Sequence, residues 1–295
     1  MEPDDCAASS RAAFPPRSPY CTLSPMIRRQ VAQEYWLITQ ADHAVLSGEL
    51  SRYYGNKTYP TPSAEAVYRG ITLHDSGWPL HDDHPGVNGK NQPLDVFESP
   101  RQVTLPVWER SVEIAMAADP YAGLLVSIHA LLLSSYASSQ NGPASASWDL
   151  KEPRARFEVN RFQHRMFEIQ EMLRLQLGMR VDLPLTNGLA SGLTDPAEAR
   201  LKSDYQCLAA MDMASLALCC TRPPFDTHRE LFLHFQRDGN DLLVDKWPFS
   251  SPAIEVKVPF RRVPARAYLD PADLQAAMNG AALESFTAAV RPHKL

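Results

Sequence analysis

The chain has 295 residues, of which 44% are hydrophobic and 21% charged, and its net charge is -5 at pH 7. This length and apolar content suffice for a sizeable core and exclude disorder of the whole chain. The negative charge gives no general attraction to nucleic acid or anionic lipid, and no apolar run approaches the roughly 20 residues of a transmembrane helix. Five cysteines without C-x-x-C spacing indicate neither a disulfide framework nor a thiolate zinc site. We therefore expect a soluble, cytoplasmic protein that binds neither nucleic acid nor membrane.

The N-terminal part of the chain divides into a tail and the first patterned elements. Residues 1–25 are rich in Ser, Pro and Ala and lack the apolar run of a secretory signal, so we expect a disordered tail there and a single folded domain over residues 26–295. Residues 28–39 end in an aromatic and β-branched run that predicts a short strand. Apolar residues at helical spacing predict a helix over 42–55, capped by Asp42, and a second helix from Thr61 or Ser63 to Asp75.

The middle of the chain is helical in pattern after a long polar segment. Residues 81–106 are punctuated by Pro and Gly and predict a long loop. Apolar spacing then predicts four helices, over residues 107–118, 121–138, 157–179 and 197–220. The second of these is apolar almost all round, which is typical of a central helix. The five tryptophans are scattered, so the sequence predicts no aromatic platform for nucleic acid.

The C-terminal part changes to short runs with the spacing of strands. These runs predict a small antiparallel sheet over about residues 228–265, followed by a closing helix over 271–290 with Asp270 as its cap. The predicted fold class is therefore mainly α: a helical bundle with a small C-terminal antiparallel β appendage and a closing helix.

Two acidic positions suggest a metal site. His74 and Asp75 are adjacent at a predicted helix end, where both side chains can converge on one ion, although further His-Asp pairs in the chain make this dipeptide weak evidence alone. Asp212 lies within the apolar run LAAMDMASLAL, where a buried carboxylate needs a partner. That partner is either a metal ion or a basic residue, the nearest in sequence being Lys202 and Arg222.

Further histidines could complete such a site. His43 lies at the head of an apolar helix, whereas His129 lies in VSIHALLL and is either a core histidine bonded to a carbonyl or water, or an additional ligand or hydrogen-bond donor. His81, His84 and Lys90 lie in the predicted loop. They mark either a second metal or substrate-binding loop or an exposed segment without a ligand.

The order of these residues resembles a known superfamily. His43, then His74-Asp75, then a distant helical Asp212 are similar to the signature of the HD-domain metal-dependent phosphohydrolases. More narrowly, ITQADHAVLSGEL, LHDSGW, SIHALLLSSYA and AAMDMASLALCC resemble an uncharacterised bacterial family known only as a domain of unknown function. The resemblance implies an HD-like helical fold in which these four residues bind a divalent Zn, Mn or Fe ion. Its bound water would be the nucleophile, with Asp75 orienting or deprotonating that water and His129 as a fifth ligand or a neighbour of the ligands.

The same resemblance implies hydrolysis of a small phosphorylated substrate, either a phosphomonoester or a phosphodiester. Lys57, Arg69 or Lys90 are candidates to bind the phosphate, whereas the glycine-rich phosphate cradle of other phosphate-binding proteins is absent. Two alternatives stay open: a catalytically idle relative that binds a metabolite or protein partner, and a di-iron oxygenase, for which the surplus histidines are the support. The sequence does not identify the substrate, the metal or the oligomeric state.

Overall fold

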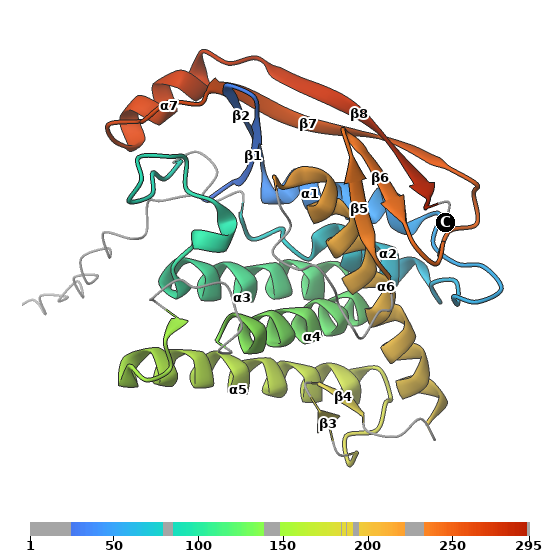
Figure 1. Ribbon diagram of the computed structural model, residues 1–295. Helices are drawn as coiled ribbons and strands as arrows, with labels where there is room; N and C mark the ends of the chain where they lie inside the picture. The colour runs from blue at the N-terminus through green and yellow to red at the C-terminus, as the bar shows by residue number, and fades with distance from the viewer. Residues whose placement is uncertain are drawn as a thin grey trace, which may run out of the picture.

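The computed structural model describes residues 25–78, 85–138, 148–183, 185–186, 188–190, 195–221 and 233–293. Residues 1–24 of the predicted tail lie outside these ranges, and so do His81 and His84. Within the described part, seven α-helices lie beneath a curved six-stranded sheet that has the form of a half-barrel (Figure 1).

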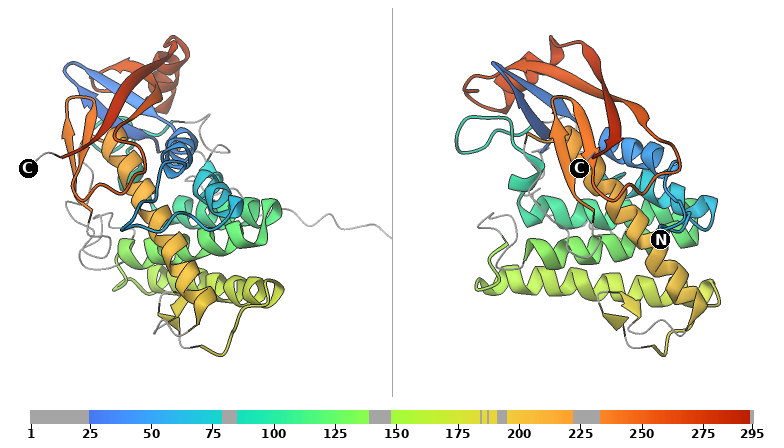
Figure 2. Two further views of the ribbon diagram at one scale, coloured as in Figure 1. Left: turned by 90° about the vertical axis from the view of Figure 1, so that its right-hand side faces the viewer. Right: turned by 45° about the vertical axis from the view of Figure 1, so that its right-hand side comes forward.

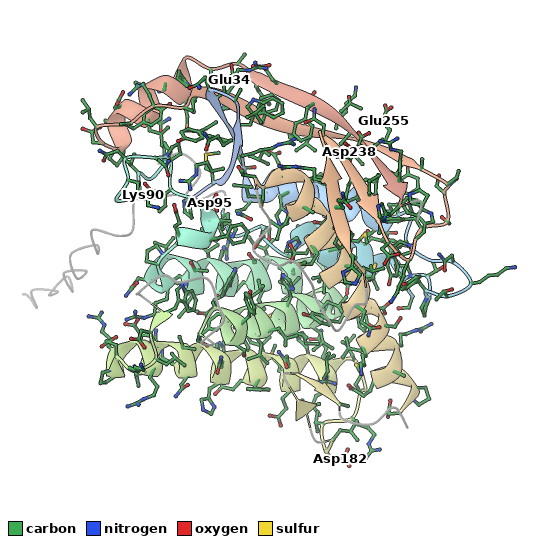
Figure 3. All side chains as sticks on the ribbon, viewed as in Figure 1. Glu34, Lys90, Asp95, Asp182, Asp238 and Glu255 are labelled. Carbon is green, nitrogen blue, oxygen red and sulfur yellow. The ribbon has the colours of Figure 1, made fainter. Side chains whose placement is uncertain are left out.

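The sheet combines both ends of the chain. Its order is β1-β2-β7-β8-β6-β5, with bounds Ile27–Val31, Glu34–Ile38, Ile254–Pro264, Leu283–Pro292, Asp241–Val244 and Phe235–Asp238. Neighbouring strands are antiparallel except β6 and β8, which are parallel. Ile254 and Val256 of β7 are buried, whereas Glu255 between them is exposed on the face away from the helices (Figure 3). The predicted mainly α fold with a small antiparallel appendage is therefore wrong, because the protein is mixed α/β.

Two segments near the chain ends account for this difference. Residues 28–39, predicted as one strand, form the β1-β2 hairpin, whose turn at Ala32 and Gln33 contains no Gly or Asn that would mark it. Ala32 adopts the left-handed conformation with φ 51°. The predicted closing helix over 271–290 ends early, at Asn279, although α7 (Pro271–Asn279) is capped by Asp270 as expected. Strand β8 follows and pairs with β7. Every second residue near the end of β8 is buried, namely Phe286, Ala288 and Val290.

The helices form layers beneath the sheet, as the views in Figure 2 also show. Helix α1 (Gln40–Ser51) packs on β7, and α6 (Pro196–Cys219) packs on β1, β5 and β6. Helix α2 (Glu65–Leu73) contacts both α1 and α4 (Pro120–Ala137). Helices α3 (Arg101–Ala118) and α5 (Pro153–Gln176) flank α4 on opposite sides, and α5 lies farthest from the sheet (Figure 1). A two-stranded ribbon of β3 (Leu185–Thr186) and β4 (Leu189–Ala190) lies near α6.

Helix α4 is central, as its apolar sequence predicts. Its 18 residues are long and apolar enough to cross a membrane, judged by length and composition alone, but 67% of the helix is buried inside the protein. The core helix of a folded domain meets the same criteria. The loop predicted over residues 81–106 is shorter than expected, because a 3-10 turn (Val96–Glu98) and the start of α3 at Arg101 lie within it.

Small residues let the helices that carry the candidate site approach closely. A Cβ atom at Gly48 of α1 would lie 2.1 Å from Oγ1 of Thr72 in α2, a separation that side chains do not tolerate. This close approach packs α1 directly against the end of α2. His43 lies earlier on α1 and His74 directly follows α2, so the two histidines lie on segments that are in contact.

Candidate metal centre

Three helices and the residue pair that follows α2 contribute side chains to one buried cluster. His43 lies in the first turn of α1, which begins at Gln40 because Thr39 caps it; Asp42, the predicted cap, is the residue whose backbone N–H donates to Thr39. His74 and Asp75 directly follow the last residue of α2, and Asp212 lies within α6. His43, His74, Asp75 and Asp212 are all buried, with no more than 7% of each residue exposed.

The distances from the two imidazoles to each other and to the two carboxylates suit ligands of one ion. Nε2 of His43 lies 3.1 Å from Nε2 of His74, 3.4 Å from Oδ2 of Asp75 and 3.3 Å from Oδ1 of Asp212. Nε2 of His74 lies 3.6 Å and 3.5 Å from the same two carboxylate oxygens. Bonds of about 2.1 Å to one metal ion place neighbouring ligand atoms about 3.0 Å apart at a right angle and about 3.4 Å apart at the tetrahedral angle. All five separations lie close to these values.

Hydrogen bonding at the far side of His74 directs its free nitrogen into the cluster. Nδ1 of His74 lies 2.7 Å from the carbonyl oxygen of Ile71. Because a carbonyl oxygen can only accept, Nδ1 carries the proton, and in the neutral ring Nε2 keeps its lone pair. Metal-binding histidines are held in the same way, by a hydrogen bond from the nitrogen that does not bind the metal.

Two serines contact His43, one at its ring and one at its backbone. Its Nδ1 lies 2.5 Å from Oγ of Ser215. The Ser215 hydroxyl donates to the carbonyl of Asp212 at 2.9 Å, and the Ser47 hydroxyl donates to the carbonyl of His43 at 3.0 Å. The two hydroxyl oxygens also lie 2.8 Å apart. When each serine donates its proton to a carbonyl, Nδ1 of His43 is the donor to Ser215 and its Nε2 carries a lone pair. Two Nε2 lone pairs that face each other at 3.1 Å require a positive charge between them, either a proton or a metal ion.

The charges of the cluster also favour a cation. Burial opposes protonation of His74, but the carboxylates of Asp75 and Asp212 outweigh burial and raise its pKa to about 9. Burial likewise opposes ionisation of the two aspartates, yet the neighbouring imidazoles outweigh it and hold the pKa of each below its ordinary value. Nε1 of Trp78 donates to Oδ1 of Asp75 at 3.2 Å, while Oδ2 is the oxygen nearest the imidazoles. Two buried, ionised carboxylates need a balancing cation.

His129 completes the cluster from the middle of α4. Its Nε2 lies 3.5 Å from Oδ2 of Asp212, and its ring meets that of His74 edge to face. Within the described residues neither ring nitrogen has a hydrogen-bond partner, so no protein carbonyl binds this imidazole there. Burial lowers its pKa to about 4, which keeps the imidazole neutral at pH 7.

Three imidazoles surround the carboxylate of Asp212 in the described part of the structure. Its carboxylate lies next to the imidazoles of His43, His74 and His129. No hydrogen bond or ion pair joins it to Lys202, and Arg222 lies outside the described residues. Together, the described His and Asp residues can hold a metal ion.

The cluster forms one wall of a pocket of about 100 Å³. Most of the remaining wall is aromatic or aliphatic: Trp78, Val96, Phe97, Trp108, Leu133, Tyr136, Trp148 and Leu216. Gln40 also lines the pocket, and its side-chain nitrogen is buried without a hydrogen-bond partner. Among the residues that the structure describes, the pocket is lined by no Lys or Arg.

The cations predicted to bind phosphate lie elsewhere. Lys90 is exposed on a turn beside the segment that carries Asp95 (Figure 3), and Lys57 is also exposed. Arg69 donates to a backbone carbonyl at the end of α3. None of these three cations lines the pocket. The second metal or substrate loop at His81 and His84 stays a prediction, because both lie outside the described residues.

Sequence reasoning missed the groups that orient the ligands and shape the pocket. Ser215 follows Asp212 by three residues in α6, and Ser47 follows His43 by four in α1, so helical spacing was a usable signal for both. The aromatic wall had no such signal. Trp78, Trp108 and Trp148 come from three separate segments, and only the folded chain brings them to one pocket.

Comparison with known proteins places the chain in a family. Residues 26–265 match the model described as "Protein of unknown function (DUF3891)", a range that contains every residue of the cluster. No curated protein and no solved structure matches the chain. The predicted resemblance to an uncharacterised family is thus confirmed, whereas the resemblance to the HD-domain superfamily has no support from these comparisons and rests on the four side chains alone. The chain belongs to the DUF3891 family of proteins of unknown function.

Proposed function

We propose that this protein is a metal-dependent hydrolase that cleaves a small phosphoester. His43, His74, Asp75 and Asp212 would hold one divalent ion, for which a set of two imidazoles and two carboxylates suits zinc, manganese or iron. When bound, such an ion supplies Lewis acidity and lowers the pKa of a coordinated water to about 7. The observation that carries this proposal is the set of five ligand-atom separations between 3.1 and 3.6 Å.

The protein's own side chains would position and deprotonate the attacking water. The carboxylate of Asp75, fixed on one side by the Trp78 N–H, orients the water and accepts one of its protons. The water oxygen forms the new bond to phosphorus, and the ester P–O bond breaks. The leaving ester oxygen keeps the electron pair and takes up a proton from solvent, while Asp75 returns its proton to solvent.

His129 would act on the substrate beside the ion. Its imidazole is neutral and buried, and its nitrogens form no hydrogen bond within the described residues. A neutral ring can donate one N–H to a phosphoryl oxygen as negative charge develops there. His129 also lines the pocket beside the cluster, where a substrate would lie.

The described cluster supports one ion rather than two. Two groups of potential ligands can be drawn, one with His43 and Asp75 and one with His129 and Asp212, but both use His74. Because Nδ1 of His74 is bonded to a carbonyl, only its Nε2 can bind metal, and that atom serves one ion. This favours a mononuclear hydrolase over a di-iron oxygenase.

The test combines metal analysis with a hydrolysis assay. Purified protein is analysed for bound metal and assayed with bis(4-nitrophenyl) phosphate and 4-nitrophenyl phosphate, with and without added Mn²⁺. We expect about one ion per chain and metal-dependent turnover. His43→Ala should lose both, whereas His164→Ala, a matched change at an exposed histidine of α5, should keep both.

The outcomes separate the alternatives. A bound ion without turnover of any phosphoester would favour the catalytically idle relative, and a coloured, iron-rich, oxygen-sensitive protein would favour the oxygenase. Absence of metal from wild-type protein after loading and dialysis would overturn the proposal.

A further inference from the structure

The pocket beside the candidate metal centre is small and apolar. Its volume is about 100 Å³, and three tryptophans, a phenylalanine, a tyrosine and aliphatic side chains form most of its lining. The rings of Trp108 and Trp148 lie 5.8 Å apart between centroids. Since an apolar cavity of about 150 Å³ accepts a benzene ring, this space suits an apolar group no larger than a single ring.

The charges around the pocket limit what the reacting end of a substrate can carry. The ionised carboxylates of Asp75 and Asp212 would offset a divalent ion, which leaves a centre with no net formal charge. No Lys or Arg among the described residues lines the pocket to balance further negative charge. Burying a doubly charged phosphomonoester there would leave anionic charge without a partner in an apolar environment, which is costly.

One polar group in the pocket awaits a partner. Gln40 is 2% exposed, and its Nε2 donates to no acceptor among the described residues. It begins the helix that carries His43, one turn before that ligand, and both residues line the pocket. A buried amide N–H without an acceptor is energetically unfavourable. A substrate oxygen that accepts a hydrogen bond from this N–H would remove that cost.

We infer that the substrate carries at most one negative charge at its reacting ester, together with a small apolar group that fills the aromatic pocket while Gln40 donates to an ester oxygen. This inference rests on the proposed hydrolase and narrows its substrate class, from phosphoesters in general to singly charged esters of a small apolar group.

The test measures binding, so that it does not depend on turnover. Mn²⁺-loaded protein is titrated calorimetrically at about pH 8 with methyl phenylphosphonate, which carries one negative charge, and with phenylphosphonate, which carries two. We expect the singly charged ligand to bind at least about ten-fold more tightly. Equal binding, tighter binding of the doubly charged ligand, or no binding of either would overturn the inference.

A charge introduced into the pocket should change this preference. Leu133 is half-buried on α4, one turn after His129, and lines the pocket. Leu133→Lys should shift the ratio of the two affinities toward phenylphosphonate by about ten-fold or more. Leu132→Lys places the same charge one residue away, outside the lining, and should leave the ratio unchanged. Metal content and circular dichroism of both variants establish that they are folded.

Failure of this inference and failure of the proposed function give different results. If phosphoesters are not hydrolysed but methyl phenylphosphonate still binds preferentially, the hydrolase proposal falls and the binding preference stands. If metal-dependent hydrolysis occurs with the phosphomonoester preferred and Leu133→Lys has no effect, the hydrolase stands and the substrate class is wrong.

Discussion

Replacing Ser215 with alanine removes the acceptor that fixes the tautomer of His43. Nδ1 of His43 donates to Ser215 Oγ at 2.5 Å, and this bond keeps the proton away from Nε2, the atom that faces His74. In Ser215→Ala the Nδ1 proton would be buried without an acceptor. The ring then gains stability when the proton moves to Nε2, where it blocks metal binding.

The magnitude follows from the kind of group removed. Loss of a residue that orients a metal-binding histidine typically weakens metal binding by about 10–100-fold, or about 1.4–2.7 kcal/mol. Calorimetric titration of metal-free protein with Zn²⁺ or Mn²⁺ measures this change. The control is Ser51→Ala in the same helix as His43, which removes an equally buried hydroxyl that donates only to the Gly48 carbonyl. Unchanged affinity in Ser215→Ala, or equal losses in both variants, would refute the reasoning.

Three further predictions concern catalysis, packing and pH. His129→Ala should retain the metal but lower kcat about 100-fold, as measured by metal analysis and the phosphoester assay; loss of the metal would instead make His129 a ligand. Gly48→Ala should lower the free energy of unfolding by about 1–3 kcal/mol in chemical denaturation, and Thr72→Ala in the same background should restore part of it, because Thr72 Oγ1 is the nearest obstacle. Burial raises the pKa of Asp95 to about 6, above its ordinary value, so its protonation stabilises the fold below that pH and the contribution is lost as pH rises through 6. The stability of wild type relative to Asp95→Asn should therefore fall by about 1 kcal/mol between pH 5 and pH 7, and a pH-independent difference would contradict this.

Local sequence patterns predicted the helices well and the sheet poorly, for physical reasons. The long helices α4 and α6 have strong apolar patterns and an Asp-Pro start, so local signals suffice to locate them. Strand β8 contains FTAAV, whose alanines favour a helix, and it becomes a strand because β7 offers it a paired edge. The pairing of β2 with β7 joins residues more than 200 positions apart, which no local pattern encodes.

Parts of the candidate site could likewise be predicted from the sequence, and other parts could not. Asp212 could be chosen from sequence because a carboxylate within an apolar helix is costly without a partner, and His74 and Asp75 because they are adjacent at a helix end. His43 was added because it lies at the head of an apolar helix. Their convergence depends on the packing of α1 against α2 and α6, which the structure alone provides. Sequence reasoning could not predict the pocket, since its aromatic wall is assembled from α3, α4 and residues outside the α-helices.

A metal-loaded crystal structure, with anomalous diffraction collected at the absorption edge of the added ion, tests the central claim most directly. We expect one anomalous peak within about 2.0–2.2 Å of Nε2 of His43 and His74 and of the facing oxygens of Asp75 and Asp212. A peak elsewhere in the protein, or no peak between the two imidazoles, would contradict the account.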